Sequence, residues 1–522
     1  MLSQEQSVFD SQSFPDFELF IQSYSHVNSE KPAIISRGKQ YQYRQLFRDI
    51  LCFRSVYFKN QNLKGERVAY LCPSSYEYVI AQWSIWCSNG IAVPLCTIHP
   101  PAEIKYTLSD SQSSIVIVHK SFSSFFEPIL KDFPNIKYVE MDDFEEDLNP
   151  EIPEITFEPI DKNNGALILY TSGTTGRPKG VVITFRNLEA QISCLIKAWE
   201  WTSEDKILHT LPLHHTHGII NILTCPLWAG ATCDMIPKFD AKKVWNLWLD
   251  ESNKYTLFMA VPTIYAKLIK LYKSFPPVLQ KKATECCKQF RLMVSGSSSL
   301  PNFLFNEWKR ISGHTLLERY GMTEIGMAIG NPYNGPRVPG CVGVPFPNVK
   351  VRLVCPDTGM DVSNIPETPG EIRIKSPSVF KEYFNRKEQT IKSFDEDGWF
   401  MTGDIAVITS DNIYRILGRA SADIIKSGGY KISALEIERE LLEHPDIEDC
   451  AVVGLPDPNE WGEIVGLMYV SGTNELSLAE VREFLRPRLA KYKLPRAICR
   501  VDEVPRNTLG KINKKEVVRC ML

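Results

Sequence analysis

A stretch dense in glycine, serine and threonine is the strongest chemical signal in the chain. It reads Tyr170-Thr-Ser-Gly-Thr-Thr-Gly-Arg-Pro-Lys-Gly-Val181 and overlaps the end of a short apolar run at 166–170. Backbone amides and hydroxyls of such a loop can converge on phosphate oxygens, and Lys179 adds a positive charge. The Gly-x-x-x-x-Gly-Lys-Ser/Thr order of a P-loop is absent. By composition alone a surface loop is an equal alternative, whereas the ordered string favours phosphate binding.

A group of histidines is the second candidate for chemistry. His214, His215 and His217 lie within four residues of one another. This spacing is not that of a known zinc site, and no carboxylate flanks the three imidazoles. We therefore expect these three side chains to serve a role other than metal binding.

The elements that must position these residues predict a layered α/β fold. Short apolar runs at 67–71, 114–118 and 166–170 indicate strands, and 76–88 indicates a helix between them. We expect a domain boundary near residue 418, with a large domain at 1–418 and a small mixed α+β domain at 419–522. Within the latter, Ser433 with Glu436 and Ser477 with Glu480 predict capping boxes at two helix starts.

Composition and charge narrow the class of protein. Of 522 residues, 43% are hydrophobic and 23% charged, which is typical of a folded protein. The formal net charge of −3 argues against a dedicated nucleic-acid or membrane-surface binder. It is unevenly divided, because residues 481–520 hold 12 Lys and Arg against 4 Asp and Glu.

Cysteine usage and the uncharged stretches indicate the compartment. The 14 cysteines lack Cys-x-x-Cys spacing, which predicts reduced and mostly buried thiols. The uncharged stretch 207–233 contains four histidines and two prolines, so it does not suit a lipid-facing helix. The first thirty residues contain five acidic and no basic side chains, which argues against a signal or transit peptide. We expect a cytoplasmic protein with no membrane-spanning segment.

Six motifs in a fixed order give the chain its family resemblance. They are the 170–181 loop, His214-His-Thr-His-Gly218, Tyr320-Gly-Met-Thr-Glu324, Trp399-Phe-Met-Thr-Gly-Asp404, Gly418-Arg419 with Asp423 and Lys426, and Pro505-Arg-Asn-Thr-Leu-Gly-Lys511. Together they resemble the adenylate-forming superfamily of acyl-CoA synthetases, peptide-synthetase adenylation domains and luciferases. The resemblance implies a large adenylation domain, a mobile C-terminal lid, and an ATP-dependent acid–CoA ligase that acts through an acyl-adenylate.

The resemblance also implies an ATP site. The β- and γ-phosphates would be held by Thr171, Ser172, Gly173, Thr174, Thr175 and Lys179. The adenine would lie among Gly296, Ser297, Ser298, Tyr320, Gly321 and Met322, with Asp404 and Arg419 at the ribose. Thr323 would bind the α-phosphate and Glu324 a Mg²⁺, a hard cation that suits carboxylate and phosphate oxygens.

Catalysis would be divided between two half-reactions. In the first, a fixed Lys511 ammonium would favour the approach of a carboxylate to the α-phosphate, and His214 would gate or order the site. In the second, the thiol of coenzyme A would attack the adenylate after the lid rotates. Ser421, Ala422 and Asp423 are the candidate hinge residues. Ser427, Gly428, Gly429 and Tyr430 would form the coenzyme A face. Arg419 stands four positions before Asp423, where many relatives have three, so the hinge position stays open.

Arg319 is the residue that bears on the acid. Relatives that take fatty or aryl acids commonly have Gly or Thr here, and a buried guanidinium requires a partner. A dicarboxylate would supply one through its distal carboxylate. A protein carboxylate, Glu318 or Glu324, is the alternative. His217 and Ser295 would border the same acyl pocket.

Segments 291–301 and 313–326 look most like those of malonyl-CoA synthetases. The expected reaction is malonate, ATP and CoA to malonyl-CoA, AMP and diphosphate, with methylmalonate as a second substrate because one methyl group discriminates weakly. A medium-chain or aryl acid–CoA ligase is the alternative, and a non-catalytic protein on the same fold is a remote one. A nucleic-acid partner lacks a recognisable motif, and the oligomeric state is open.

Overall fold

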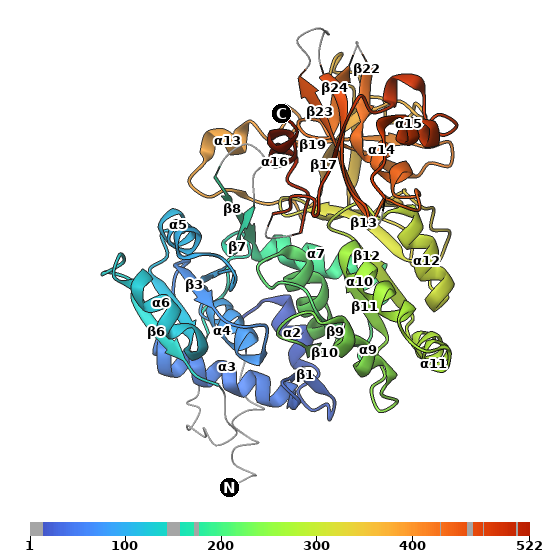
Figure 1. Ribbon diagram of the computed structural model, residues 1–522. Coiled ribbons are helices and arrows are strands. Elements are labelled where there is room, and N and C mark those ends of the chain that lie inside the picture. The colour runs from blue at the N-terminus through green and yellow to red at the C-terminus, as the bar shows by residue number, and fades with distance from the viewer. Residues whose placement is uncertain are drawn as a thin grey trace.

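The computed structural model describes residues 14–143, 157–171, 177–427, 430–456, 463–472, 474–507 and 510–522. A large N-terminal part is capped by a smaller C-terminal part, coloured orange to red at the top of Figure 1. The predicted mixed α/β layering is confirmed, since two large sheets with helices form the N-terminal part.

The first large sheet has nine strands in the order β15-β14-β13-β12-β11-β9-β10-β1-β2. Its central strands run parallel, and antiparallel hairpins close both edges. The strands are β1 Pro32–Ser36, β2 Lys39–Gln42, β9 Lys206–His209, β10 Thr232–Met235, β11 Leu257–Ala260, β12 Leu292–Ser295, β13 Leu317–Met322, β14 Gly326–Gly330 and β15 Val344–Pro345.

The second large sheet has seven strands in the order β18-β8-β7-β4-β3-β5-β6. The three predicted strands are confirmed within a residue or two as β3, β5 and β7. The strands are β3 Arg67–Leu71, β4 Ile91–Pro94, β5 Ile115–His119, β6 Lys137–Met141, β7 Gly165–Thr171, β8 Lys179–Thr184 and β18 Glu382–Tyr383. Antiparallel β7 and β8 flank the predicted phosphate loop.

The helix predicted at 76–88 is α4, Tyr76–Cys87, and it joins the two sheets. Every one of its residues is buried, because it packs against β1 of the first sheet and against β3 and β4 of the second. The other helices of this part are α2 Glu18–Tyr24, α3 Tyr43–Phe58, η1 Lys120–Phe122, α5 Pro101–Ser111, α6 Ser123–Leu130, α7 Phe185–Ala198, η2 His217–Thr224, α8 Cys225–Trp228, α9 Ala241–Leu249, α10 Pro262–Lys273, α11 Pro277–Cys287, α12 Asn302–Ser312 and α13 Lys387–Ile391.

An antiparallel four-stranded sheet leads to the C-terminal part. It comprises β16 Lys350–Val354, β17 Gly370–Lys375, β19 Phe400–Ile408 and β20 Tyr414–Arg419. Beyond it lie β21 Ile424–Ser427, β22 Tyr430–Ser433, α14 Ala434–Leu441, β23 Asp449–Pro456, β24 Glu463–Val470, α15 Leu478–Leu485, η3 Lys491–Lys493, β25 Ala497–Arg500 and α16 Lys514–Met521.

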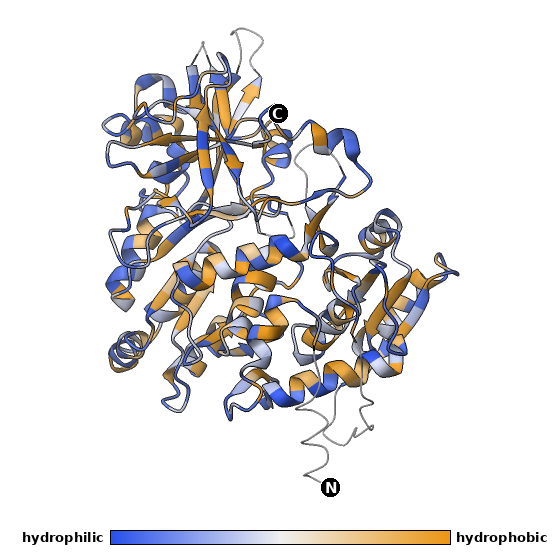
Figure 2. Ribbon diagram, turned by 180° about the vertical axis from the view of Figure 1, so that it is seen from behind, coloured by the Kyte–Doolittle hydropathy of each residue, from blue (hydrophilic) through white to orange (hydrophobic). Residues whose placement is uncertain are grey.

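The C-terminal part has hydrophobic clusters of its own, the first of which begins at Ile425 and ends at Leu494. Figure 2 shows hydrophobic residues concentrated along its strands and hydrophilic residues on the outer loops. Both predicted caps form, but only Ser477 with Glu480 makes a complete capping box. Ser433 accepts from the Glu436 amide, and no reciprocal bond from the Glu436 side chain completes that box.

Two further expectations concern the cysteines and the membrane. All fourteen cysteines are free thiols, and ten of them are buried. Among the residues that the structure describes, no helix has both the length and the apolar character needed to cross a bilayer.

Candidate active site

A large cleft between the N- and C-terminal parts collects most of the predicted site residues. Its volume is about 2220 Å³, and it is lined from both parts of the chain. The predicted residues on its wall are Thr171, Lys179, His214, His217, Ser297, Ser298, Arg319, Tyr320, Gly321, Met322, Thr323, Glu324, Asp404, Arg419, Ser421, Ala422, Asp423 and Lys511.

Some predicted residues lie elsewhere. Ser427 and Tyr430 are on the β21–β22 hairpin and do not line the cleft in this arrangement. Ser295 and Gly296 lie behind the wall, and the buried Ser295 hydroxyl has no hydrogen-bond partner among the described residues. Ser172, Gly173, Thr174, Thr175, Gly428 and Gly429 lie outside the described residues.

The β13–β14 hairpin presents the segment 319–324 to the cleft. Gly321 is required there, because a Cβ atom would overlap the carbonyl of Gly326 on the facing strand. The hairpin therefore holds Arg319 and Tyr320 on β13 and places Thr323 and Glu324 in the turn.

Asp404 and Arg419 are direct partners across the β19–β20 hairpin. The Arg419 Nε donates to Asp404 Oδ1 at 2.8 Å, and the Tyr320 hydroxyl donates to Asp404 Oδ2 at 2.6 Å. Burial opposes the charge on Arg419, but Asp404 raises the pKa of the guanidinium overall. The bond from Tyr320 was not predicted, and it fixes the ring and the carboxylate in one unit.

Glu324 is buried beside Lys179 and Tyr383. Its Oε1 accepts from the Tyr383 hydroxyl at 2.9 Å, and the Lys179 ammonium lies 4.7 Å from the centre of the Tyr383 ring. Burial raises the pKa of the Glu324 carboxyl, and the Tyr383 bond opposes this shift. Sequence reasoning missed Tyr383, because it lies 59 residues beyond Glu324 on the two-residue strand β18 and no motif marks it.

Lys511 reaches the cleft from the C-terminal part. Its backbone amide donates to the Asn507 side chain at 3.0 Å. The side chain is open to the solvent of the cleft, yet the surrounding protein and the Arg419 charge lower its pKa, and Asp404 opposes them. The C-terminal part is thus closed over the site, and Arg439 of α14 also donates to the Ser299 hydroxyl of the N-terminal part at 3.2 Å.

Arg319 is 4% exposed, and its Nε and Nη2 have no hydrogen-bond partner within the described part of the chain. Burial lowers the pKa of its guanidinium to about 9. Gly296 allows this packing, since a Cβ there would overlap the guanidinium. Glu318 accepts from the Leu300 amide at 3.0 Å, and Glu324 accepts from Tyr383. No ion pair joins Arg319 to Glu318 or Glu324 in the described part of the chain, and Glu318 Oε2 is likewise buried without a partner there.

The His217 and Ser297 side chains line the same part of the cleft as Arg319. His217 Nδ1 is 3.1 Å from the Ser297 hydroxyl, and His217 Nε2 is buried without a partner among the described residues. Burial and the Arg319 charge lower the pKa of His217 well below its usual value, so this imidazole is neutral. A cation and neutral hydrogen-bonding groups in one pocket can receive an anionic group of a ligand.

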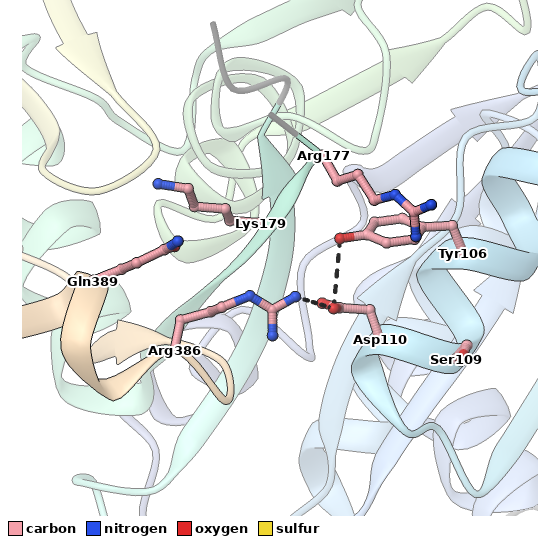
Figure 3. Close-up of a pocket in the computed structure, with 7 residues that line it drawn as sticks. All are labelled: Tyr106, Ser109, Asp110, Arg177, Lys179, Arg386 and Gln389. Carbon is pink, nitrogen blue, oxygen red and sulfur yellow. Dashed lines mark hydrogen bonds and ion pairs between the residues drawn. The ribbon is translucent and has the colours of Figure 1, made fainter. Parts of the chain in front are cut away.

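A second cavity of about 440 Å³ adjoins the phosphate loop, and Lys179 lines both spaces (Figure 3). Asp110 pairs with Arg386 there, and it also accepts from the Tyr170 hydroxyl at 2.9 Å. Arg177 lies 5.7 Å from the centre of the Tyr106 ring. With three cationic side chains against one carboxylate, the cavity extends the positive region beside the loop.

Comparison with known proteins shows the family to which the chain belongs. A family described as AMP-binding enzyme matches residues 21–384, and the AMP-binding enzyme C-terminal domain matches residues 436–511. The chain belongs to the AMP-binding enzyme family. It is 45% identical to a mitochondrial malonate–CoA ligase of Xenopus laevis, over 94% of this chain and 90% of that protein.

Solved structures of the family share this fold. ATP-bound MatB from Rhodopseudomonas palustris has a TM-score of 0.85 and 31% identity, over 96% of this chain and 98% of that one. A malonyl-CoA ligase in a ternary product complex with methylmalonyl-CoA and AMP has a TM-score of 0.66 and 33% identity, over 93% of this chain and 99% of that one. At similar identity, this AMP-binding enzyme is thus more like the ATP-bound structure in overall arrangement.

Proposed function

We propose that this AMP-binding enzyme is a malonate–CoA ligase, which converts malonate, ATP and CoA to malonyl-CoA, AMP and diphosphate. The observation that carries the proposal is the buried Arg319 guanidinium, whose Nε and Nη2 have no hydrogen-bond partner among the described residues. A cation in that position is costly to the free protein unless a ligand pairs with it. The 45% identical relative is named for the same acid.

The first half-reaction joins malonate to AMP. One malonate carboxylate attacks the α-phosphorus of ATP and diphosphate leaves, while the distal carboxylate pairs with Arg319. Lys511 supplies positive charge between the two approaching anions, where it reduces their repulsion in the transition state. Thr323 binds the α-phosphate, and the Asp404–Arg419 pair on β19 and β20 receives the ribose hydroxyls.

Mg²⁺ fits the donor set that the cleft presents. Glu324 offers a buried carboxylate held by Tyr383, with Lys179 close by for the phosphates. A hard cation with one protein carboxylate and several phosphate oxygens is a common arrangement for Mg²⁺. When bound, the ion would offset the charge that develops on the leaving diphosphate.

The second half-reaction requires the C-terminal part to move. We infer that residues 419–522 form the lid, and that it rotates near Ser421, Ala422 and Asp423 to bring the Ser427–Tyr430 hairpin face to coenzyme A. Asp423 accepts from the Arg419 amide at 3.0 Å and lies 3.6 Å from the Lys514 ammonium. Gly418 permits the tight turn, since its φ is +135° and a side chain there would meet Asp423.

Methylmalonate is proposed as a second substrate. It retains both carboxylates, so the Arg319 pair is kept, and one methyl group in a pocket discriminates by roughly 1–3 kcal/mol. A product complex with methylmalonyl-CoA is known for a 33% identical malonyl-CoA ligase.

The test is a substrate panel. Purified protein is incubated with ATP, Mg²⁺, CoA and malonate, methylmalonate, succinate, acetate, octanoate or coumarate, and AMP and thioester are measured. Malonate is expected to give the highest kcat/KM. Faster turnover of octanoate or coumarate than of malonate would assign the chain to the medium-chain or aryl ligases instead.

The compartment is a separate proposal. A cytoplasmic location was predicted from composition, whereas the Xenopus laevis relative carries the word mitochondrial in its name. Cell fractionation with antibody detection distinguishes the two, and recovery of the protein in the mitochondrial fraction would overturn the cytoplasmic prediction.

A further inference from the structure

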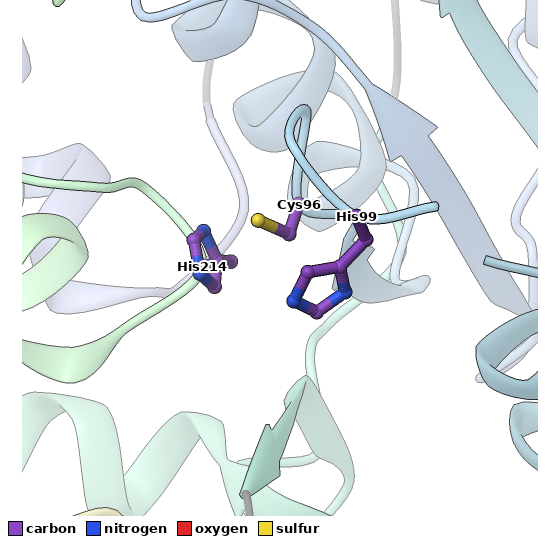
Figure 4. A group of neighbouring side chains, drawn as sticks. All are labelled: Cys96, His99 and His214. Carbon is purple, nitrogen blue, oxygen red and sulfur yellow. The ribbon is translucent and has the colours of Figure 1, made fainter. Parts of the chain in front are cut away.

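Three metal-binding side chains from two separate loops meet beside the cleft. Cys96 and His99 follow β4, and His214 lies between β9 and η2 (Figure 4). One donor atom from each residue lies within 4.8 Å of the donor atoms of the other two. In Figure 4 the Cys96 sulfur and a ring nitrogen of His99 point toward the His214 ring.

The loop after β4 is built as a chelating turn. The His99 amide donates to the Cys96 carbonyl at 3.2 Å, which closes a four-residue turn and brings the two side chains to one side. The Cys-x-x-His spacing resembles that of paired zinc ligands. Pro100 and Pro101 follow immediately and start α5, so the turn is fixed at its end.

The surroundings of the two imidazoles suit metal binding. His99 Nδ1 lies 3.2 Å from Glu103 Oε2 on the first turn of α5, which leaves Nε2 free to bind. A carboxylate on the far nitrogen is the usual outer partner of a metal-binding histidine. His214 Nε2 is buried with no hydrogen-bond partner among the described residues, and the His99 and His214 ring centres are 5.8 Å apart.

A second cluster of possible ligands, Glu77, His119 and Asp143, is different in kind. Arg37 pairs with Asp143 and lies 4.0 Å from Glu77. A protein cation thus already neutralises that cluster, whereas no ion pair of a Lys or Arg with Cys96, His99 or His214 is found in the described residues.

We propose that Cys96, His99 and His214 bind a zinc-like divalent cation at the edge of the cleft, which gives His214 a metal-binding role that the spacing of the three neighbouring histidines did not predict. One thiolate and two imidazoles suit Zn²⁺ and exclude Mg²⁺ or Ca²⁺, which prefer oxygen ligands. Binding releases the Cys96 thiol proton to solvent. Cys96 and His214 line the cleft, so the fourth position faces the substrate space and is taken by water or a ligand group.

The proposed site has a consequence for turnover. A bound ion would join the loop after β4 to the loop after β9 and hold His214 in place. Because His214 is proposed to gate or order the site, Zn²⁺ is expected to inhibit the ligase reaction. This consequence rests on the proposed function, whereas metal binding itself does not.

Cobalt titration of the metal-free full-length protein tests the site. One equivalent of Co²⁺ is expected to give the intense visible bands of tetrahedral cobalt and a thiolate-to-cobalt charge-transfer band, both abolished by one equivalent of Zn²⁺. Cys96→Ser should lose the charge-transfer band. Cys286→Ser, which changes a partly buried cysteine of α11, is the matched control and should retain it.

Glu103→Gln gives a milder variant, since its side chain is 49% exposed and glutamine keeps its size. Loss of the outer carboxylate should weaken Zn²⁺ about 10- to 100-fold in competition with a chromophoric chelator. Absence of saturable Co²⁺ bands in the wild type, or their persistence in Cys96→Ser, would overturn the site. A wild-type protein that shows the Co²⁺ bands but has no malonate–CoA ligase activity would count against the proposed function alone.

Discussion

Replacing Arg319 with methionine separates its role in binding from its cost to the fold. Methionine keeps much of the side-chain volume and removes the charge, so the distal carboxylate of malonate loses its partner. Removing one member of a buried, hydrogen-bonded charge pair typically costs about 3–4 kcal/mol. At about 1.4 kcal/mol per factor of ten, kcat/KM for malonate should fall roughly 100- to 1000-fold. Binding of ATP should change little.

Stability is expected to move in the opposite direction. In the free protein the guanidinium is 4% exposed, and its Nε and Nη2 lack partners among the described residues. Replacing such a cation with an apolar side chain should therefore raise the unfolding midpoint. The assay is malonate-dependent thioester formation, with calorimetric unfolding in parallel. Arg310→Met, an arginine on the exposed face of α12, is the control and should keep kcat/KM within a factor of two. An Arg319→Met enzyme with wild-type malonate kinetics would refute the reasoning.

Four further outcomes are expected. Lys511→Ala should abolish malonate-dependent ATP–diphosphate exchange yet still transfer acyl from supplied malonyl-adenylate to CoA, and equal loss of both would contradict a role confined to the first step. In the wild type, ATP–diphosphate exchange should decline with rising pH before pH 10.5, the ordinary pKa of a lysine, because the pKa of Lys511 is lowered and its ammonium is lost below that pH. Exchange that stays constant beyond pH 10.5 would contradict this role of Lys511. Tyr383→Phe should raise the Mg²⁺ concentration required for exchange, most at low pH, because the pKa of Glu324 rises further without its donor. Lys514→Met should lower stability by about 3–5 kcal/mol in urea unfolding, because it leaves Glu438 and Asp423 without their cation.

Local patterns were enough to predict three strands and one helix of the N-terminal part. Short apolar runs predicted β3, β5 and β7 to within a residue or two, because a strand buried on both faces is a short continuous apolar segment. The resemblance implied that Asp404 and Arg419 both lie at the ribose, and the structure adds a direct pairing across the β19–β20 hairpin that was not predicted. The resemblance then indicated which segments of the chain meet in the cleft.

Contacts between distant segments could not be predicted in this way. Tyr383 meets Glu324, and Cys96 meets His214, only because the sheets bring separate loops together. No periodicity or motif encodes such pairs in a single sequence. Whether Arg319 has an ion-pair partner could not be predicted either, because the sequence is compatible both with a pair to Glu318 and with an unpaired guanidinium. The hydrogen bonds decide between them, since Glu318 accepts from the Leu300 amide and Arg319 Nε and Nη2 have no partner among the described residues.

The domain division at residue 418 stays a prediction with a direct test. The separate C-terminal clusters begin at Ile425, and β20 extends the N-terminal part to Arg419. Limited proteolysis should cut first near 420–424 when the lid is in motion. Protection of that segment in the presence of ATP and malonate is expected, since Ser421, Ala422 and Asp423 line the cleft that the ligands fill.

Comparison of malonate with its monomethyl ester tests the central claim most directly. The ester keeps the reacting carboxylate, neutralises the distal one and adds one methyl group, whose own effect is measured by comparing malonate with methylmalonate. We predict that the wild type favours malonate by at least about 100-fold in kcat/KM, because a site built for a charged group rejects the analogue that lacks it. Similar kcat/KM for malonate and its ester would show that Arg319 does not recognise the distal carboxylate, and would contradict the proposed specificity.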